Sequence, residues 1–94
     1  MKISEFQQLI ERIYYEKDKA RGIPADLAWL VEEVGELAKA IRKGNKDQLA
    51  EEFADVFAWL CTLASLTGVK MEEAAAKYAS GCPKCLSIPC RCPG

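Results

Sequence analysis

The spacing of apolar residues is the feature that most constrains this chain, because it follows a helical period through most of the length. Apolar side chains recur three or four residues apart in stretches that are separated by glycines at positions 22, 44 and 68. Such spacing places these side chains on one face of an α-helix. The pattern predicts an all-α fold, an antiparallel bundle of about four helices that is completed by oligomerisation.

The turn-forming residues set the expected helix boundaries. We expect helices over Ser4 to about Lys19, Pro24 to Arg42, Asn45 or Asp47 to about Thr67, and about Met71 to Ala79. Ser4 is the expected N-cap of the first helix, and residues 21–24 should break the chain before the second. Residues 81–94 are rich in Pro, Gly and Cys, so we expect an irregular tail there and a helical domain over residues 1–80.

The third predicted helix has an unusual stripe of small residues, formed by Ala50, Ala54, Ala58 and Cys61. A stripe of this kind lets another helix approach closely. It indicates either ordinary packing within the chain, with Cys61 as a small core residue, or an interface between subunits. A chain of 94 residues buries little surface when it folds alone, which makes a second chain a reasonable expectation.

Composition excludes several classes of function. The chain has no histidine, so it has no histidine general base, metal ligand or catalytic pair. Its net charge is −1, which argues against charge-driven binding to nucleic acid. The sequence has no apolar run long enough to span a membrane and no uninterrupted apolar signal segment at its start. We therefore expect a cytoplasmic protein with no membrane or nucleic-acid partner.

Acidic residues stand at matched spacings on two consecutive predicted helices. Glu33 and Glu36 are three residues apart, and so are Glu52 and Asp55, so the members of each pair share a helix face. Glu52 falls within the apolar arc of its helix, where an ionised carboxylate is costly without a partner. Because a short loop favours antiparallel neighbours, we expect the two pairs to converge.

Four converging carboxylates repel one another unless a cation lies between them. Carboxylate oxygens are preferred ligands of hard divalent ions, and Mg²⁺ is typical of sites that process phosphates. We therefore predict a Mg²⁺ site formed by Glu33, Glu36, Glu52 and Asp55. The alternative is that such glutamates are simply solvated. We favour that alternative for Glu51 and leave it open for Glu32.

The same stretches carry a family signature. The first motif reads EEVGE at residues 32–36, and the second reads EFAD at residues 52–55, with 15 residues between them. In this order and spacing they resemble the motifs of the MazG-like superfamily of all-α nucleoside triphosphate pyrophosphohydrolases. The longer stretches LVEEVGELAKAI and EEFADVFAWL are also similar to typical members. The resemblance covers about residues 1–80, which would be the catalytic domain.

This resemblance implies an activity and a set of roles. Members hydrolyse the bond between the α and β phosphates, and they are typically homodimers or homotetramers in which two chains frame each site. The resemblance assigns Mg²⁺ binding to the four acids named above and assigns Glu32 to the attacking water. It also places Lys77 where the family often has a phosphate-binding cation, although a solvated lysine is the alternative. Trp29 shares the stripe of Glu33 and is a candidate for stacking on a base, with core packing as the alternative.

The tail adds a second metal-binding pattern that the family does not require. Cys82, Cys85, Cys90 and Cys92 form two closely spaced pairs, which suits a structural Zn²⁺ site in a cytoplasmic protein. Disulfides and an iron–sulfur cluster are the alternatives. Four sulfur ligands leave no open position, so we do not expect catalytic zinc there.

Two other functions compete with the one that the resemblance implies. The first is a phosphoribosyl-ATP pyrophosphohydrolase, which would have a similar acidic scaffold. The second is a non-catalytic helical dimer whose zinc-binding tail recognises a partner. Only Lys84 and Arg91 provide basic support for a nucleic-acid partner, and the tail has no aromatic residue for base stacking.

Overall fold

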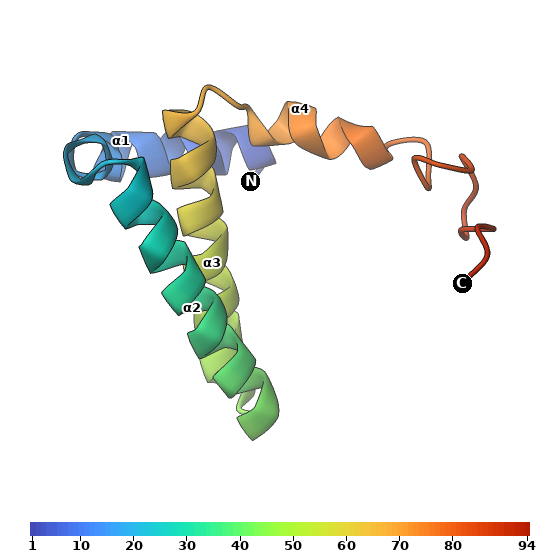
Figure 1. The fold of residues 1–94 in the computed structure, drawn as a ribbon, viewed down its shortest axis with the longest axis horizontal. Helices are drawn as coiled ribbons and strands as arrows, with labels where there is room; N and C mark the ends of the chain where they lie inside the picture. Colours follow the sequence, from blue (N-terminus) through green and yellow to red (C-terminus); the bar gives the residue numbers. More distant parts are fainter.

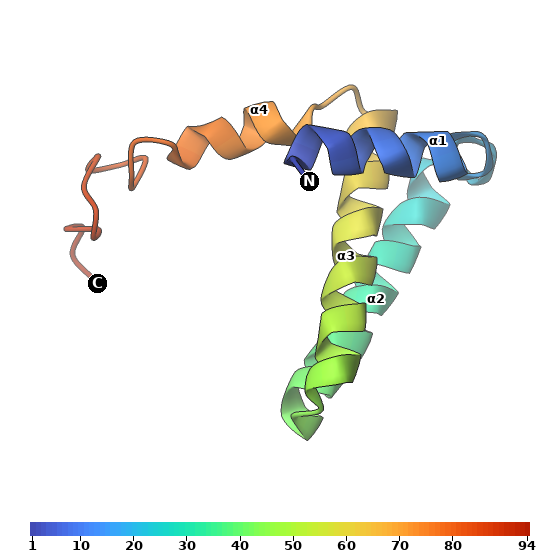
Figure 2. The same ribbon diagram turned by 180° about the vertical axis from the view of Figure 1, so that it is seen from behind.

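The computed structural model describes residues 1–94 and consists of helices joined by short turns (Figure 1). Its elements are α1 (Ile3–Arg21), α2 (Ile23–Lys43), α3 (Lys46–Leu66), α4 (Met71–Ala75) and a 3₁₀ turn (Ala76–Tyr78). α2 and α3 form an antiparallel hairpin, and α1 crosses its open end. α4 and the irregular tail lead away from the hairpin (Figure 2). The predicted all-α class with four helices is confirmed.

The turn between α1 and α2 is tighter than the sequence predicts. Only Gly22 lies outside the two helices, with a φ of +91° that favours glycine. Pro24 stands in the first turn of α2, where its missing N–H is not needed. The break expected over residues 21–24 is present, but it is confined to Gly22. The predicted N-cap Ser4 is wrong, because α1 begins at Ile3 and the N–H of Lys2 donates to Glu5 Oε1 at 2.8 Å.

The turn between α2 and α3 follows the prediction. Gly44 ends α2 in the left-handed conformation, with a φ of +73°. The Asn45 side chain then caps α3, because its Oδ1 accepts hydrogen bonds from the backbone N–H groups of Asp47 and Gln48 at 3.1 and 3.2 Å. This turn fixes the antiparallel hairpin that brings the acidic stretches of α2 and α3 together.

The fourth helix is shorter than predicted. The α-helical part ends at Ala75, and the 3₁₀ turn carries the chain to Tyr78. Gln7 of α1 anchors this segment: its Nε2 donates to the Val69 carbonyl at 2.9 Å, and its Oε1 accepts from the Met71 N–H at 2.8 Å. The same amide donates to Ser65 Oγ at 3.0 Å. One buried glutamine therefore joins α1 to the end of α3 and the start of α4.

The core within one chain is thin. Only eight residues are buried, and Cys61 is one of them, which confirms its predicted place in the core. Phe6 of α1 stacks on Phe57 of α3 with ring centroids 4.8 Å apart. Large apolar side chains remain exposed along the hairpin, including Val31 at 65% and Phe53 at 56%. The helices thus form their backbone hydrogen bonds internally, but they leave much apolar side-chain surface exposed.

None of the helices taken singly is long and apolar enough to cross a membrane. Lys46–Leu66 and Met71–Tyr78 are together long and apolar enough, but the two segments are bent by 107° relative to each other.

Candidate functional site

The α2–α3 hairpin brings acids from both helices together. Glu33 of α2 meets Glu52 and Asp55 of α3, so that one carboxylate oxygen from each lies within 4.8 Å of the others. The three-residue spacing on α3 and the antiparallel packing produce this convergence. Three oxygens this close can share one divalent cation, for which carboxylates are suitable ligands.

No basic side chain neutralises the negative charge of this cluster. Partial burial raises the pKa of the Glu33 carboxyl, and the charges of Asp55, Glu52, Glu36 and Glu32 raise this pKa further. Glu52 has a buried oxygen, Oε2, with no hydrogen-bond partner. The three ion pairs of the structure all lie elsewhere. A buried oxygen without a donor and without a neighbouring cation is the feature that a bound metal ion would explain.

The remaining acids lie around the cluster. Glu36 acts on Glu33 through its charge, but its side chain is exposed and outside the group of three. Glu32 is exposed and also acts on Glu33 through its charge. Glu51 is exposed, in agreement with its interpretation as a solvated glutamate. The structure thus brings three of the four predicted Mg²⁺ ligands together, with Glu36 at the margin.

Two tryptophans lie about one helical turn away from the acids, one on each helix of the hairpin. Trp29 precedes Glu33 by four residues, and Trp59 follows Asp55 by four. Their rings are parallel, with an interplanar angle of 7° and centroids 6.2 Å apart. Trp29 is still 44% exposed, so part of its ring remains open to solvent beside the acidic cluster.

A buried polar network supports this region and was not predicted from the sequence. Arg21 pairs with Asp18 and, through Nε at 2.9 Å, with Asp26. Thr62 Oγ1 donates to Asp18 Oδ2 at 2.8 Å, and the guanidinium lies 5.2 Å from the centre of the Trp59 ring. The hydrogen bond to Asp26 raises the pKa of Arg21 above its usual value.

The network joins the first three helices at the open end of the hairpin, and its arginine lies over the Trp59 ring. In the sequence, Asp26 looks like an ordinary acid in the first turn of a helix. Only the fully buried position that it occupies distinguishes it.

Lys77 lies apart from the acids in this chain. It belongs to the 3₁₀ turn beyond α4, and its ammonium lies 5.7 Å from the centre of the Tyr78 ring. This segment leads away from the hairpin (Figure 1).

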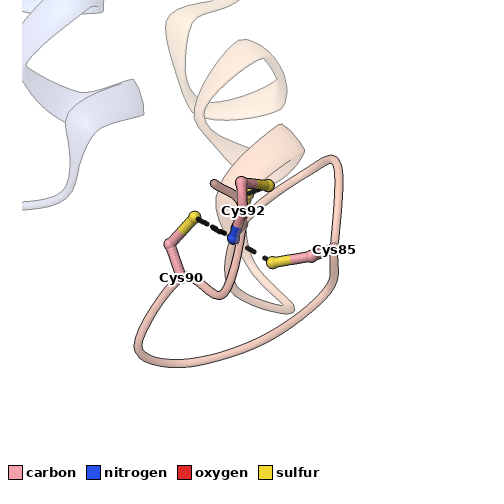
Figure 3. Close-up of side chains that lie close together, drawn as sticks. Cys85, Cys90 and Cys92 are labelled. Atoms are coloured by element: carbon pink, nitrogen blue, oxygen red, sulfur yellow. Dashed lines mark hydrogen bonds between the residues drawn. The ribbon is translucent and has the colours of Figure 1, made fainter. Parts of the chain in front are cut away.

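The four tail cysteines form a second cluster of metal-binding side chains. Their sulfurs all lie within 4.8 Å of one another, and Figure 3 shows Cys85 and Cys90 directed toward Cys92. Backbone hydrogen bonds from Arg91 and Ser87 lower the pKa of Cys85 to about 6. Hydrogen bonds with the neighbouring thiols, that of Cys90 first, raise the pKa of Cys92 to about 11. Within the cluster, the Cys85 thiol therefore loses its proton more readily than the Cys92 thiol.

Fold and site together define a class of protein: an all-helical chain in which two antiparallel helices present a half-buried cluster of carboxylates. Comparison with known families agrees with this class. Residues 23–86, about two thirds of the chain, match the model of the MazG nucleotide pyrophosphohydrolase domain. The chain therefore belongs to this family, as its two acidic motifs suggested. No curated protein matches the chain.

Proposed function

We propose that this protein is a Mg²⁺-dependent nucleoside triphosphate pyrophosphohydrolase that releases a nucleoside monophosphate and pyrophosphate. The observation that carries the proposal is the convergence of Glu33, Glu52 and Asp55, with one buried oxygen of Glu52 left without a partner. The chain belongs to a family of nucleotide pyrophosphohydrolases, which suggests the reaction that this cluster would catalyse.

The donor set fits the ion that the family implies. Glu33, Glu52 and Asp55 supply oxygens at close range, and Glu36, whose charge acts on Glu33, is the candidate fourth ligand. When bound, Mg²⁺ neutralises phosphate charge and makes a nearby water more acidic. No lysine or arginine pairs with these acids, so the site keeps its negative charge for a cation.

Glu32 is the candidate for handling the attacking water. Its carboxylate borders the cluster and is exposed, so it can accept a hydrogen bond or a proton from a water that approaches from solvent. A carboxylate can serve as a general base where histidine is absent. In this proposal Glu32, Glu33, Glu36, Glu52 and Asp55 form the catalytic set.

Trp29 is the candidate for holding the base. Its ring is stacked on Trp59 and half-exposed, one helical turn from Glu33. A nucleobase can extend such a stack, because every base has a π-face. Lys77 remains the candidate for a phosphate contact. Since its segment leads away from the hairpin of its own chain (Figure 1), it would act on the site of a second copy.

The exposed apolar face of the hairpin supports a homodimer or homotetramer. Phe53, Ala54, Val56, Phe57 and Leu60 line a wholly apolar hollow of about 430 Å³ on α3. Few small chains keep such a surface open to water while burying only eight residues. A second copy of this chain covers that face in the proposed assembly and encloses the acidic cluster. Ala54 belongs to this face, which favours the subunit-interface interpretation for that part of the small-residue stripe, whereas Cys61 packs within the chain.

The proposed location is the cytoplasm, where reducing conditions keep the four tail thiols free to bind metal. We also divide the chain at residue 80, with a catalytic domain before it and a metal-binding tail after it. The change from helix to irregular backbone after Tyr78 supports this division.

Product identification by ³¹P NMR tests the proposed reaction. The full-length protein is incubated with Mg²⁺ and a panel of ribo- and deoxyribonucleoside triphosphates, with phosphoribosyl-ATP as a further member. Signals of a monophosphate and of pyrophosphate are expected from at least one triphosphate. Orthophosphate release instead would contradict cleavage between the α and β phosphates, and turnover of phosphoribosyl-ATP alone would favour the alternative enzyme.

A further inference from the structure

The cysteine tail has nothing but its own backbone to hold it in the observed shape. Residues 81–94 contain no helix, and none of their side chains is fully buried. Leu86 and Ile88 are exposed, the latter at 82%. No hydrogen bond or ion pair joins residues 82–94 to the helices. A segment of this kind cannot offset the loss of chain entropy by apolar burial, so a compact shape requires another stabilising element.

The spacing of the four sulfurs fits a single tetrahedral ion. The Sγ atoms of Cys82 and Cys92 are 3.8 Å apart, and those of Cys85 and Cys90 are 4.0 Å apart. With a zinc–sulfur bond of about 2.3 Å, the sulfurs of a regular ZnS₄ site stand about 3.8 Å apart. A disulfide would require a separation of about 2.05 Å. A cluster of several irons would spread its ligands further, because each cysteine then binds a different iron.

The backbone of the tail is arranged around these sulfurs. The N–H of Arg91 donates to Cys85 Sγ at 3.3 Å. The N–H of Cys92 donates to Cys90 Sγ, also at 3.3 Å (Figure 3). Hydrogen bonds of this type stabilise the negative charge of metal-bound thiolates. The Leu86 N–H donates to the Cys82 carbonyl at 2.7 Å, which closes a tight turn between the first two cysteines.

Gly81 allows the loop to close on itself. Its φ is +103°, and a Cβ at this position would lie 2.7 Å from Ile88 Cγ1 and 2.9 Å from the Ser87 carbonyl oxygen. Any other residue would clash there and push the two halves of the tail apart. The close approach of residue 81 to residues 87 and 88 is what brings the two cysteine pairs face to face.

We propose that Cys82, Cys85, Cys90 and Cys92 bind one Zn²⁺ ion, and that this ion folds residues 81–94 into a module independent of the acidic site. Each thiol releases its proton to solvent as its sulfur binds, and no electron is transferred. Soft thiolates select zinc, whereas the carboxylates of the hairpin select hard ions, so the two sites do not compete. Zinc is favoured over ferrous iron because it binds such ligands more tightly.

Titration of the reduced, metal-free protein with Co²⁺ tests the site without any nucleotide. Tetrahedral cobalt–thiolate absorption bands should appear, saturate at one ion per chain and disappear on addition of Zn²⁺. The double variant Cys82→Ser/Cys85→Ser and, separately, Cys90→Ser/Cys92→Ser should lose these bands, while Cys61→Ser should keep them. Absence of the bands in the wild type, or their persistence in both double variants, would overturn the proposal.

Two further readouts test the nature and the independence of the site. Elemental analysis of the protein as purified should find zinc, whereas iron with visible absorption, or tail thiols lost to disulfides, would refute zinc as the ligand. Both double variants should keep the helical circular dichroism signal of the wild type within experimental error, and loss of that signal would refute an independent module. Because no readout uses a nucleotide, failure here is distinguishable from failure of the proposed hydrolysis.

Discussion

Glu33 and Glu52 face each other across the α2–α3 interface with carboxylate oxygens within 4.8 Å, and no basic side chain pairs with either. Two like charges at this distance destabilise the hairpin that holds them. The hairpin therefore carries an electrostatic cost that a bound cation would remove. The same two carboxylates should therefore lower the stability of the metal-free protein and be required for its activity.

The substitution Glu52→Gln separates the two effects. It removes a charge from the cluster, so the metal-free protein should gain stability on the order of 0.5 kcal/mol, while pyrophosphate release should fall by roughly 100-fold or more. Thermal denaturation in a chelator and a pyrophosphate assay with Mg²⁺ measure the two quantities. Glu51→Gln is the matched control, because Glu51 is exposed on the same helix, and it should change neither quantity. Full activity in Glu52→Gln would exclude Glu52 from the site.

The buried network around Arg21 should be essential for stability rather than for chemistry. Arg21→Ala leaves Asp18 and Asp26 buried without their shared partner. The loss should be about 3 kcal/mol, near the low end for a broken buried pair, because the arginine itself is 38% exposed. Urea denaturation measures this loss. Arg42→Ala is the control, since Arg42 is exposed and forms no ion pair. Equal stabilities of the two variants would show that the network contributes little.

Removal of the exposed tryptophan ring should weaken substrate binding. Trp29→Ala deletes the surface on which the base is proposed to stack, and such contacts contribute about 1–3 kcal/mol per base. KM should therefore rise by about 5- to 150-fold while kcat changes little. Trp29→Phe keeps an aromatic face and should restore most of the affinity. If both variants bind nucleotide as the wild type does, Trp29 is only a packing partner of Trp59.

The apolar hollow on α3 should control the oligomeric state. Phe53→Ser replaces a 56% exposed aromatic ring and should shift the protein toward the monomer in light scattering after gel filtration. Ile88→Ser is the control, because Ile88 is more exposed than Phe53 but lies in the tail, away from the hollow. A wild-type protein that is monomeric at micromolar concentration would contradict the proposed assembly.

The sequence predicted those features that depend on neighbouring residues. The all-α class follows from apolar spacing, and the cap at Asn45 and the stop at Gly44 follow from local backbone chemistry. The N-cap at Ser4 failed because the helix begins two residues earlier, where Glu5 accepts the Lys2 N–H. The convergence of Glu33, Glu52 and Asp55 was predictable because a short loop left one packing arrangement for the two helices.

The features that were missed depend on contacts between residues far apart in sequence. Gln7 looks like a surface residue, yet it is buried by segments more than 50 residues away. Asp26 likewise gives no sign that it will be fully buried and paired with Arg21 of α1. α1 extends to Arg21 because that residue pairs with Asp18 in the same turn and with Asp26 beyond Gly22. Local patterns contain no information about such pairs.

Binding of Mn²⁺, followed by electron paramagnetic resonance of the free ion, tests most directly whether the hairpin acids hold a divalent cation. Mn²⁺ is a hard ion that prefers carboxylates to the tail thiols, so its binding reports on this site alone. We predict saturable binding to the wild type, competition by Mg²⁺, and loss of this binding in Glu33→Gln and Glu52→Gln but not in Glu51→Gln. Undiminished binding in both site variants, or none in the wild type, would contradict the account.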